Sequence, residues 1–474
     1  MHKKIGRSAA VLAVIGVTGC SPFEEYRSAY PEVCVSSTAT PSPECETHAL
    51  QQLPSANGNR YLLGFIEFDD QGQLWNHKQM AAVVGKLQEE SGTKEILMVV
   101  FAHGWKHNAA PGDTNIQTFR QVLAQLSDFE AQIAKLTGVA PRTVAGVYLG
   151  WRGASMPVPL LENLTFWDRK NTALKVGHGG VTEVLSRLEL IKRDKQSTVP
   201  NKNSKSGKEC LEASRDDTHT RLVIVGHSLG GALVHSALTQ VLQQRFVQTT
   251  GCAGTQGDVG GFADLVVLIN PASEAMQFSP LSDMATERRT YFASQLPVVL
   301  QLTSEADAAT RYAFPVGRWF STRFEKTRER QRWNAVTQAP ETIDESQANI
   351  AAVGHFQPYR THRLYPRNDR ERAQVQPLST NDSVQLFIQS STDWASDKPG
   401  NKISFGEVIL ERSANSAGRN PYLFTYVDKS LITDHIDIDG PRVIEFVKQL
   451  ILVSAQSPGE VMAIRRLQKP ATKL

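Results

Sequence analysis

A serine flanked by glycines is the feature of this chain best suited to chemistry. The aliphatic run 222–225, preceded by Arg221, ends in the segment 226–230, Gly-His-Ser-Leu-Gly, and a helix-compatible segment, 232–246, follows at once. A strand, a tight turn and a helix in this order lift a serine hydroxyl above the end of a sheet. The turn needs glycine on both sides, because a Cβ there would collide with the strand or the helix. The same letters also occur in plain glycine-rich turns, but the flanking elements favour Ser228 as a nucleophile.

The elements that would position this serine form a regular pattern. Short apolar runs, as expected of strands buried on both faces, alternate with segments whose apolar residues recur at helical spacing, such as 80–87 and 116–133. Strands alternating with helices predict an α/β fold with a mostly parallel sheet and helices on both of its faces. The predicted strands are 61–68, 95–102, 143–149, 221–225, 265–269, 297–303 and 422–427.

A second motif lies at the end of the strand predicted for 95–102. His103-Gly104-Trp105 follows it directly. Together with the serine turn and the order of strands, this motif resembles the α/β-hydrolase superfamily, and within it esterases and lipases, over roughly residues 58–310 and 420–455. The resemblance implies that the backbone N–H groups of Trp105 and Leu229 form an oxyanion hole, each worth about 3–4 kcal/mol to the transition state. It implies no metal and no cofactor.

The resemblance also implies a chain order of serine, acid and histidine. Asp307 follows the strand at 297–303, where the superfamily usually carries its acid. Glu305 is its close neighbour, and Glu274 follows the preceding strand, where some lipases place the acid. Asp307 is therefore the preferred acid, with Glu305 and Glu274 left as alternatives.

The base is expected between the last strand and the last helix. His435 occupies this place, ahead of a helix that begins at Pro441. His355 and His362 also follow Asp307, but they lie in an arginine-rich segment and are expected to be surface or lid residues. We therefore predict His435 as the base.

The segment 311–419 is longer than a connection within a sheet requires. Its aromatic residues, among them Trp319, Phe320 and Trp333, are interleaved with arginines. It is predicted to be an insertion that either caps the active site or decorates the surface. The predicted domain plan is a core at 58–310, this insertion at 311–419, and the end of the core with a tail at 420–474.

The N-terminus resembles a bacterial lipoprotein signal. Residues 1–19 combine a basic start with an apolar run too short to span a bilayer, and Cys20 follows small residues. The resemblance implies diacylation of Cys20, and Ser21 after it favours the outer membrane of the cell envelope. An ordinary secretory peptide that leaves Cys20 in the mature chain is the alternative. Residues 20–57, rich in Ser, Thr and Pro, are expected to be a tether.

The net charge of the chain bears on whether it binds nucleic acid, and its cysteines indicate the compartment in which it folds. The chain has 51 Lys and Arg against 48 Asp and Glu, and residues 1–19 hold three basic and no acidic residues, which leaves 48 against 48 in the mature chain. A chain without net charge is a poor partner for nucleic acid. Besides Cys20 there are four cysteines, an even number that suits disulfides in an oxidising compartment, and their spacing does not resemble a zinc site. Topology places Cys210 and Cys252 at the edge opposite the active site, which predicts a bridge between them, while Cys34 and Cys45 lie close together in the tether.

These features predict a serine hydrolase that cleaves a carboxylic ester or lipid through an acyl-enzyme formed on Ser228, with His435 as base and Asp307 as its orienting acid. A peptidase or a thioesterase with the same three residues is one alternative. A hydrolase-like envelope protein without activity is another, although such a protein would be free to lose these side chains.

Overall fold

The computed structural model describes residues 22–154, 165–197, 220–251, 254–368, 376, 378–395 and 402–456. Cys20, Cys210, Cys252 and the predicted signal segment lie outside these residues, so the lipid anchor and the Cys210–Cys252 bridge remain predictions. Within the described residues, no helix has both the length and the apolar character needed to cross a membrane.

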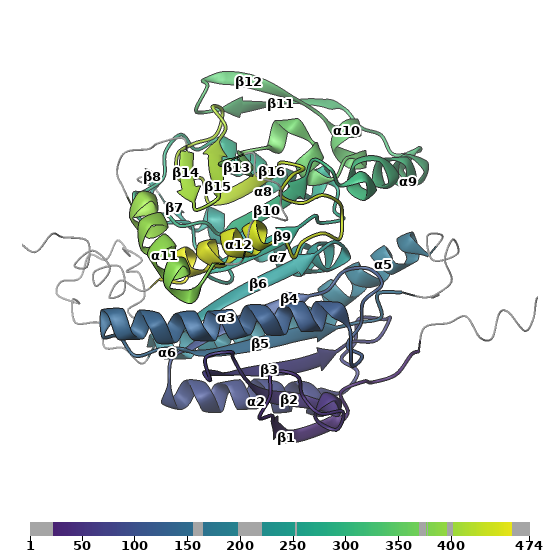
Figure 1. The fold of residues 1–474 in the computed structure, drawn as a ribbon. Helices are drawn as coiled ribbons and strands as arrows, with labels where there is room; N and C mark the ends of the chain where they lie inside the picture. Colours follow the sequence, from purple (N-terminus) through teal and green to yellow (C-terminus); the bar gives the residue numbers. More distant parts are fainter. Residues whose placement is uncertain are drawn as a thin grey trace, which may run out of the picture.

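A twelve-stranded sheet runs through the whole molecule (Figure 1). All neighbouring strands from β3 to β13 in the sheet order are parallel, and antiparallel pairs occur only toward the two edges. The order is β1 (Ala29–Val35), β2 (His48–Pro54), β3 (Arg60–Glu67), β5 (Thr143–Gly150), β4 (Ile96–Ala102), β6 (Arg221–His227), β9 (Leu265–Ile269), β10 (Val299–Ser304), β16 (Tyr422–Val427), β13 (His362–Pro366), β15 (Val408–Arg412) and β14 (Lys402–Phe405).

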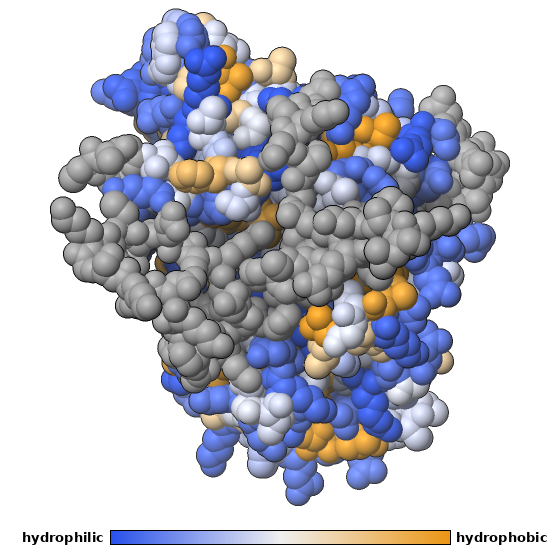
Figure 2. Space-filling model, turned by 90° about the vertical axis from the view of Figure 1, so that its left-hand side faces the viewer, coloured by the Kyte–Doolittle hydropathy of each residue, from blue (hydrophilic) through white to orange (hydrophobic). Residues whose placement is uncertain are grey.

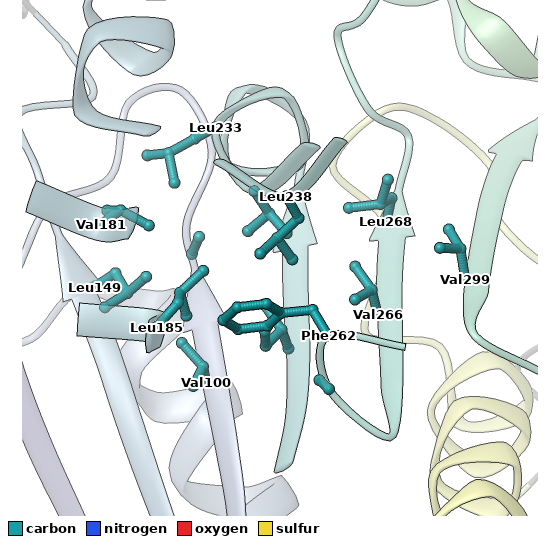
Figure 3. Close-up of a cluster of buried hydrophobic side chains, with 14 of the residues drawn as sticks. Val100, Leu149, Val181, Leu185, Leu233, Leu238, Phe262, Val266, Leu268 and Val299 are labelled. Atoms are coloured by element: carbon teal, nitrogen blue, oxygen red, sulfur yellow. The ribbon is translucent and has the colours of Figure 1, made fainter. Parts of the chain in front are cut away.

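Helices cover both faces of this sheet, and each face has its own apolar core. Side chains alternate along a strand, so Leu222 and Ile224 of β6 enter one core while Val223 and Val225 enter the other. Figure 3 shows part of the first core, where Leu233 lies toward Val181 and Leu238 lies toward Leu268. Helices α2 (His77–Thr93), α5 (Phe166–Val176), α6 (Thr182–Ser197), α7 (Leu229–Val247) and α8 (Ser279–Thr286) pack on this face, and α3 (Thr114–Thr137), α11 (Thr380–Ala395) and α12 (Pro441–Ser454) pack on the other.

The strands predicted from apolar runs are all present, with ends that agree to within two residues. The α/β class and the mostly parallel sheet with helices on both faces are therefore confirmed. Apolar runs are reliable here because a parallel strand covered on both faces has no polar side to interrupt them.

The expected tether differs from the structure. Much of 20–57 is folded, because β1 and β2 extend the sheet at one edge and a disulfide joins Cys34 to Cys45. Arg27 anchors this segment: its side chain is fully buried, donates to Glu46 and to the carbonyl of Ala109, and lies over a phenylalanine ring. A buried arginine of this kind is invisible to composition, which here pointed to a flexible linker.

Part of the segment 311–419, predicted to be an insertion, belongs to the sheet. Its second half supplies β13, which pairs in parallel with β16, and then β15 and β14, which complete the sheet. These strands are short and carry charged residues, so their sequences lack the apolar run of a central strand. The first half forms smaller elements that pack against the first apolar core. They are η4 (Ala309–Ala313), α9 (Phe314–Thr322), the hairpin β11 (Glu329–Asn334) and β12 (Ala339–Asp344), α10 (Glu345–Ile350), η5 (Val353–His355) and η6 (Gln357–Tyr359).

The remaining described elements are short. They are η1 (Cys45–Thr47), η2 (Gly177–Val181), η3 (Ala275–Phe278) and the two-residue strands β7 (Thr250–Gly251) and β8 (Gly254–Thr255). Seen from the left-hand side of Figure 1, the described surface is mostly hydrophilic, and its hydrophobic residues form small separate patches (Figure 2).

Candidate active site

Ser228 lies in a strained turn between β6 and α7. Its backbone has φ 54° and ψ −120°, a conformation that L-residues rarely adopt, and its N–H donates to the carbonyl of Ile269 at 2.9 Å. A Cβ added at Gly226 would lie 2.6 Å from the carbonyl oxygen of Gly230. The predicted strand, turn and helix are thus all present, and the close packing explains the glycine requirement.

Three side chains from distant parts of the chain form a continuous hydrogen-bonded row. Ser228 Oγ lies 2.6 Å from His435 Nε2, and His435 Nδ1 lies 2.8 Å from Asp307 Oδ2. A carboxylate oxygen only accepts, so Nδ1 carries the proton and Nε2 is free to accept from the serine hydroxyl. Ser228 and Asp307 are buried, while the His435 side chain keeps 18% of its surface exposed. The row therefore has the geometry of a nucleophile, a base and an orienting acid.

Asp307, and not its two rivals, lies beside His435. The buried Glu274 is neutralised by ion pairs with Lys170 and with Arg318, the latter at 2.8 Å. Glu305 is held through its backbone, with its N–H donating to Val427. The structure thus assigns different environments to the three candidates and brings only Asp307 to the imidazole.

Asp307 is kept ionised by donors on both sides. Burial by itself raises the pKa of this carboxyl, but the hydrogen bond and charge of His435 and two hydrogen bonds from Thr310 lower it more, so the pKa lies below its usual value. Thr310 donates its N–H to Oδ1 at 3.0 Å and its hydroxyl to Oδ2 at 2.5 Å. Asp307 therefore stays a charged acceptor for His435 at neutral pH.

Thr310 and His355 continue the row behind Asp307. His355 Nε2 lies 3.1 Å from Thr310 Oγ1, and because that hydroxyl gives its proton to Asp307, His355 must be the donor. Burial holds the pKa of His355 near 4, which keeps its ring neutral. The expectation that His355 and His362 are surface or lid residues is wrong: His355 packs behind the acid, and His362 is buried in β13. Sequence reasoning missed Thr310 and considered His355 only as a rival base. The one available signal was that Thr310 follows Asp307 by three residues, a spacing typical of a cap.

Two hydrogen bonds to the backbone carbonyl of His435 hold the loop that carries this residue. His227 Nε2 and Asn270 Nδ2 both donate to the backbone oxygen of His435, at 3.0 and 3.1 Å. Asn270 has φ 44°, and its side-chain Oδ1 accepts from the N–H of Ser304 at 2.9 Å, which ties the ends of β9 and β10 to this loop. Burial, followed by the nearby His435, lowers the pKa of His227 to about 3, so this ring is a neutral donor.

The loop after β4 lies against Ser228. A Cβ added at Gly104 would stand 2.9 Å from the Cβ of Ser228. His103 is fully buried, stacks on Trp151 at 5.4 Å, and its Nε2 accepts from the Trp151 N–H, so its Nδ1–H donates to the carbonyl of Gly104 at 2.9 Å. In a trans peptide the C=O and the next N–H point in opposite directions. His103 therefore fixes the direction of the Trp105 N–H.

The second expected donor, Leu229, is the first residue of α7. N–H groups of a first helical turn have no acceptor within their helix and are available to an anion. The two expected oxyanion donors thus flank Ser228 from different elements, one from the loop after β4 and one from the start of α7. The described residues contain no group of His, Cys, Asp or Glu side chains arranged to hold a metal ion.

Comparison with protein-family models, with curated proteins and with solved structures finds no match for this chain. Function must therefore be argued from the site itself.

Proposed function

We propose that the protein is a serine hydrolase with an α/β-hydrolase fold, which cleaves carboxylic esters through an acyl-enzyme on Ser228. The observation that carries this proposal is the hydrogen-bonded row from Ser228 Oγ through His435 to the buried Asp307. A serine, an imidazole and a carboxylate in this order are the parts needed to activate a hydroxyl at neutral pH.

In the proposed reaction, Ser228 Oγ forms a bond to the ester carbonyl carbon as its proton moves to His435 Nε2. Negative charge collects on the carbonyl oxygen, where the N–H groups of Trp105 and Leu229 would stabilise it. The C–O bond to the alcohol then breaks, and His435 returns its proton to the leaving oxygen. A water molecule, deprotonated by His435, attacks the acyl-enzyme and releases the acid. Asp307 holds the imidazole in the required tautomer and stabilises its positive charge.

Several features support an active enzyme over an inactive relative. The positive φ of Ser228 destabilises the fold. The carbonyl of His435 and the carboxylate of Asp307 are each held by two or more hydrogen bonds. A protein that only binds a ligand would need neither the strain nor these contacts. Strain and buried polar groups concentrated at one point are typical of functional sites.

Covalent labelling tests the proposal. Wild-type protein should react with a fluorophosphonate probe, whereas Ser228→Ala should not, while the thermal transition of the variant stays close to that of the wild type. Ser236→Ala is a matched control in the same helix, because its hydroxyl donates to the carbonyl of Leu233 and takes no part in the row. Labelling that persists in Ser228→Ala would refute the assignment of the nucleophile.

Turnover of esters, amides and thioesters by the same preparation then separates the reaction classes. We expect p-nitrophenyl esters to be cleaved. Labelling without turnover of any ester, combined with cleavage of peptides or acyl thioesters, would move the assignment to the corresponding class.

A further inference from the structure

A deep apolar groove begins beside the candidate active site. It has a volume of about 370 Å³ and lies between α3 and α12, on the face of the sheet that these helices cover. A volume in this range is typical of pockets that bind small molecules. Its floor consists of strand residues from the centre of the sheet: Val99, Phe101, Val225 and Ile269.

The two walls are helix stripes that face each other across the groove. On α3 the stripe is Asn115, Thr118, Phe119 and Val122, and on α12 it is Ile444, Val447, Lys448 and Ile451. Residues spaced by three, four and seven lie on one side of a helix, and seven steps cover about 10 Å. Thr118, Val122, Ile444 and Val447 remain half-buried, which shows that the helices do not close over the floor.

One end of the groove is formed by neighbours of the candidate site residues. Ile436 follows His435 and has 71% of its surface exposed, and Trp105 carries one of the expected oxyanion N–H groups. The floor residue Ile269 accepts the hydrogen bond from the Ser228 N–H. A molecule whose carbonyl lies at Ser228 would therefore have this opening within reach.

Helix α11 packs against both α3 and α12, away from the candidate site (Figure 1). Its Phe387 packs edge-on against Phe129 of α3, and Gln449 of α12 donates to the carbonyl of Ser383. The basic residues in the lining have partners: Lys448 pairs with Glu445 at 2.5 Å, His107 with Asp113 at 3.1 Å, and Lys106 Nζ lies 4.5 Å from the centre of the Trp105 ring. The groove thus offers a short apolar channel whose lining cations have partners within the protein.

We infer that this groove binds the acyl chain of the substrate and selects esters of medium-length unbranched acids. The inference rests on the proposed function, because the reaction supplies the carbonyl that anchors one end of the chain. Each methylene buried in the groove should raise kcat/KM about fourfold, until the chain reaches the end of the groove.

Kinetics with p-nitrophenyl esters of graded length test the inference. In the wild type, kcat/KM should rise from the acetate to the octanoate. Val447→Trp fills the groove from α12 and Val122→Phe fills it from α3, so each should lower the octanoate-to-acetate ratio by at least about tenfold while acetate hydrolysis is retained. Leu190→Trp is the control, because it adds the same ring to a half-exposed site on α6, which packs on the opposite face of the sheet.

A binding measurement separates failure of this inference from failure of the proposed function. Ser228→Ala should bind the fluorescent fatty acid cis-parinaric acid, and adding Val447→Trp should abolish binding. If the enzyme hydrolyses short esters without a preference for chain length and binds no parinarate, the groove does not bind the acyl chain, and the proposed hydrolase function is unaffected. Parinarate binding to a wild type that hydrolyses no ester would instead overturn the proposed reaction, and with it the groove as a substrate site.

Discussion

Thr310 offers the sharpest test of how the site is held together. Its hydroxyl donates to Asp307 Oδ2 at 2.5 Å and accepts from His355 Nε2 at 3.1 Å, so Thr310→Val removes both interactions with little change in shape. The backbone N–H of residue 310 still reaches Oδ1 in the variant. The substitution therefore isolates the contribution of one hydroxyl to a buried carboxylate.

The expected loss of activity follows from the hydrogen bond between the Thr310 hydroxyl and the Asp307 carboxylate. A hydrogen bond to a charged group is worth about 1.5–3 kcal/mol, and a buried partner left without one loses a similar amount. If this free energy is lost in full from the transition state, in which the imidazole is charged, kcat/KM falls by about 10- to 100-fold. The free energy of unfolding should fall by a comparable amount, because Asp307 is fully buried.

The pH dependence has a definite sign. The pKa of Asp307 lies below its usual value in the folded protein, so its ionised form stabilises the fold at neutral pH, and that contribution is lost as pH falls through the folded pKa. Thr310→Val removes one of the causes of the lowered pKa, so acid unfolding of the variant should begin at a higher pH than in the wild type.

Steady-state hydrolysis of p-nitrophenyl acetate, together with urea unfolding across the neutral and acidic range, measures both effects. Thr310→Ser keeps the hydroxyl and should behave nearly as the wild type. A Thr310→Val variant with wild-type kcat/KM and an unchanged acid transition would refute the reasoning that Asp307 depends on this donor.

Two further changes test other parts of the fold. Gly104→Ala places a methyl group 2.9 Å from the Cβ of Ser228, so it should displace the loop that carries the Trp105 N–H and lower kcat by about 100-fold or more, with little change in the melting temperature; unchanged turnover would show that this loop does not contact the reacting oxygen. Replacing Cys34 and Cys45 together by serine opens a loop with a sequence separation of 11 and should lower the free energy of unfolding by about 3 kcal/mol, as measured by urea denaturation. Peptide mapping without reduction should recover Cys34 joined to Cys45, and a Cys34–Cys210 peptide would contradict this pairing.

The strands and the serine turn were predictable because their causes are local. A strand buried on both faces needs an apolar run, and the turn at Ser228 needs Gly226 and Gly230 next to it in the chain. The positions of Asp307 and His435 at the ends of predicted strands were likewise readable, because the carboxyl ends of parallel strands meet at one edge of the sheet. Sequence favoured Asp307 by its place but could not exclude Glu305, two residues before it, or Glu274, after the preceding strand.

That choice was made by packing over long distances. Glu274 is neutralised by Lys170 and Arg318, which lie more than forty residues away on either side, and this leaves Asp307 as the carboxylate beside His435. Similarly, His355 contacts Thr310 from a short 3-10 turn, Val353–His355. The sequence of this turn has no apolar periodicity from which its position could be predicted.

The N-terminal segment shows the same limit. Composition alone describes residues 20–57 as a linker, but Arg27 loses all of its solvent contact to reach Glu46 and the carbonyl of Ala109, and the segment folds onto the edge of the sheet. Local sequence determined the central strands of the sheet and the position of the candidate nucleophile. The tertiary structure decided which charges find partners, because the free energy of burying a charge depends on groups that only the folded chain brings within a few ångströms.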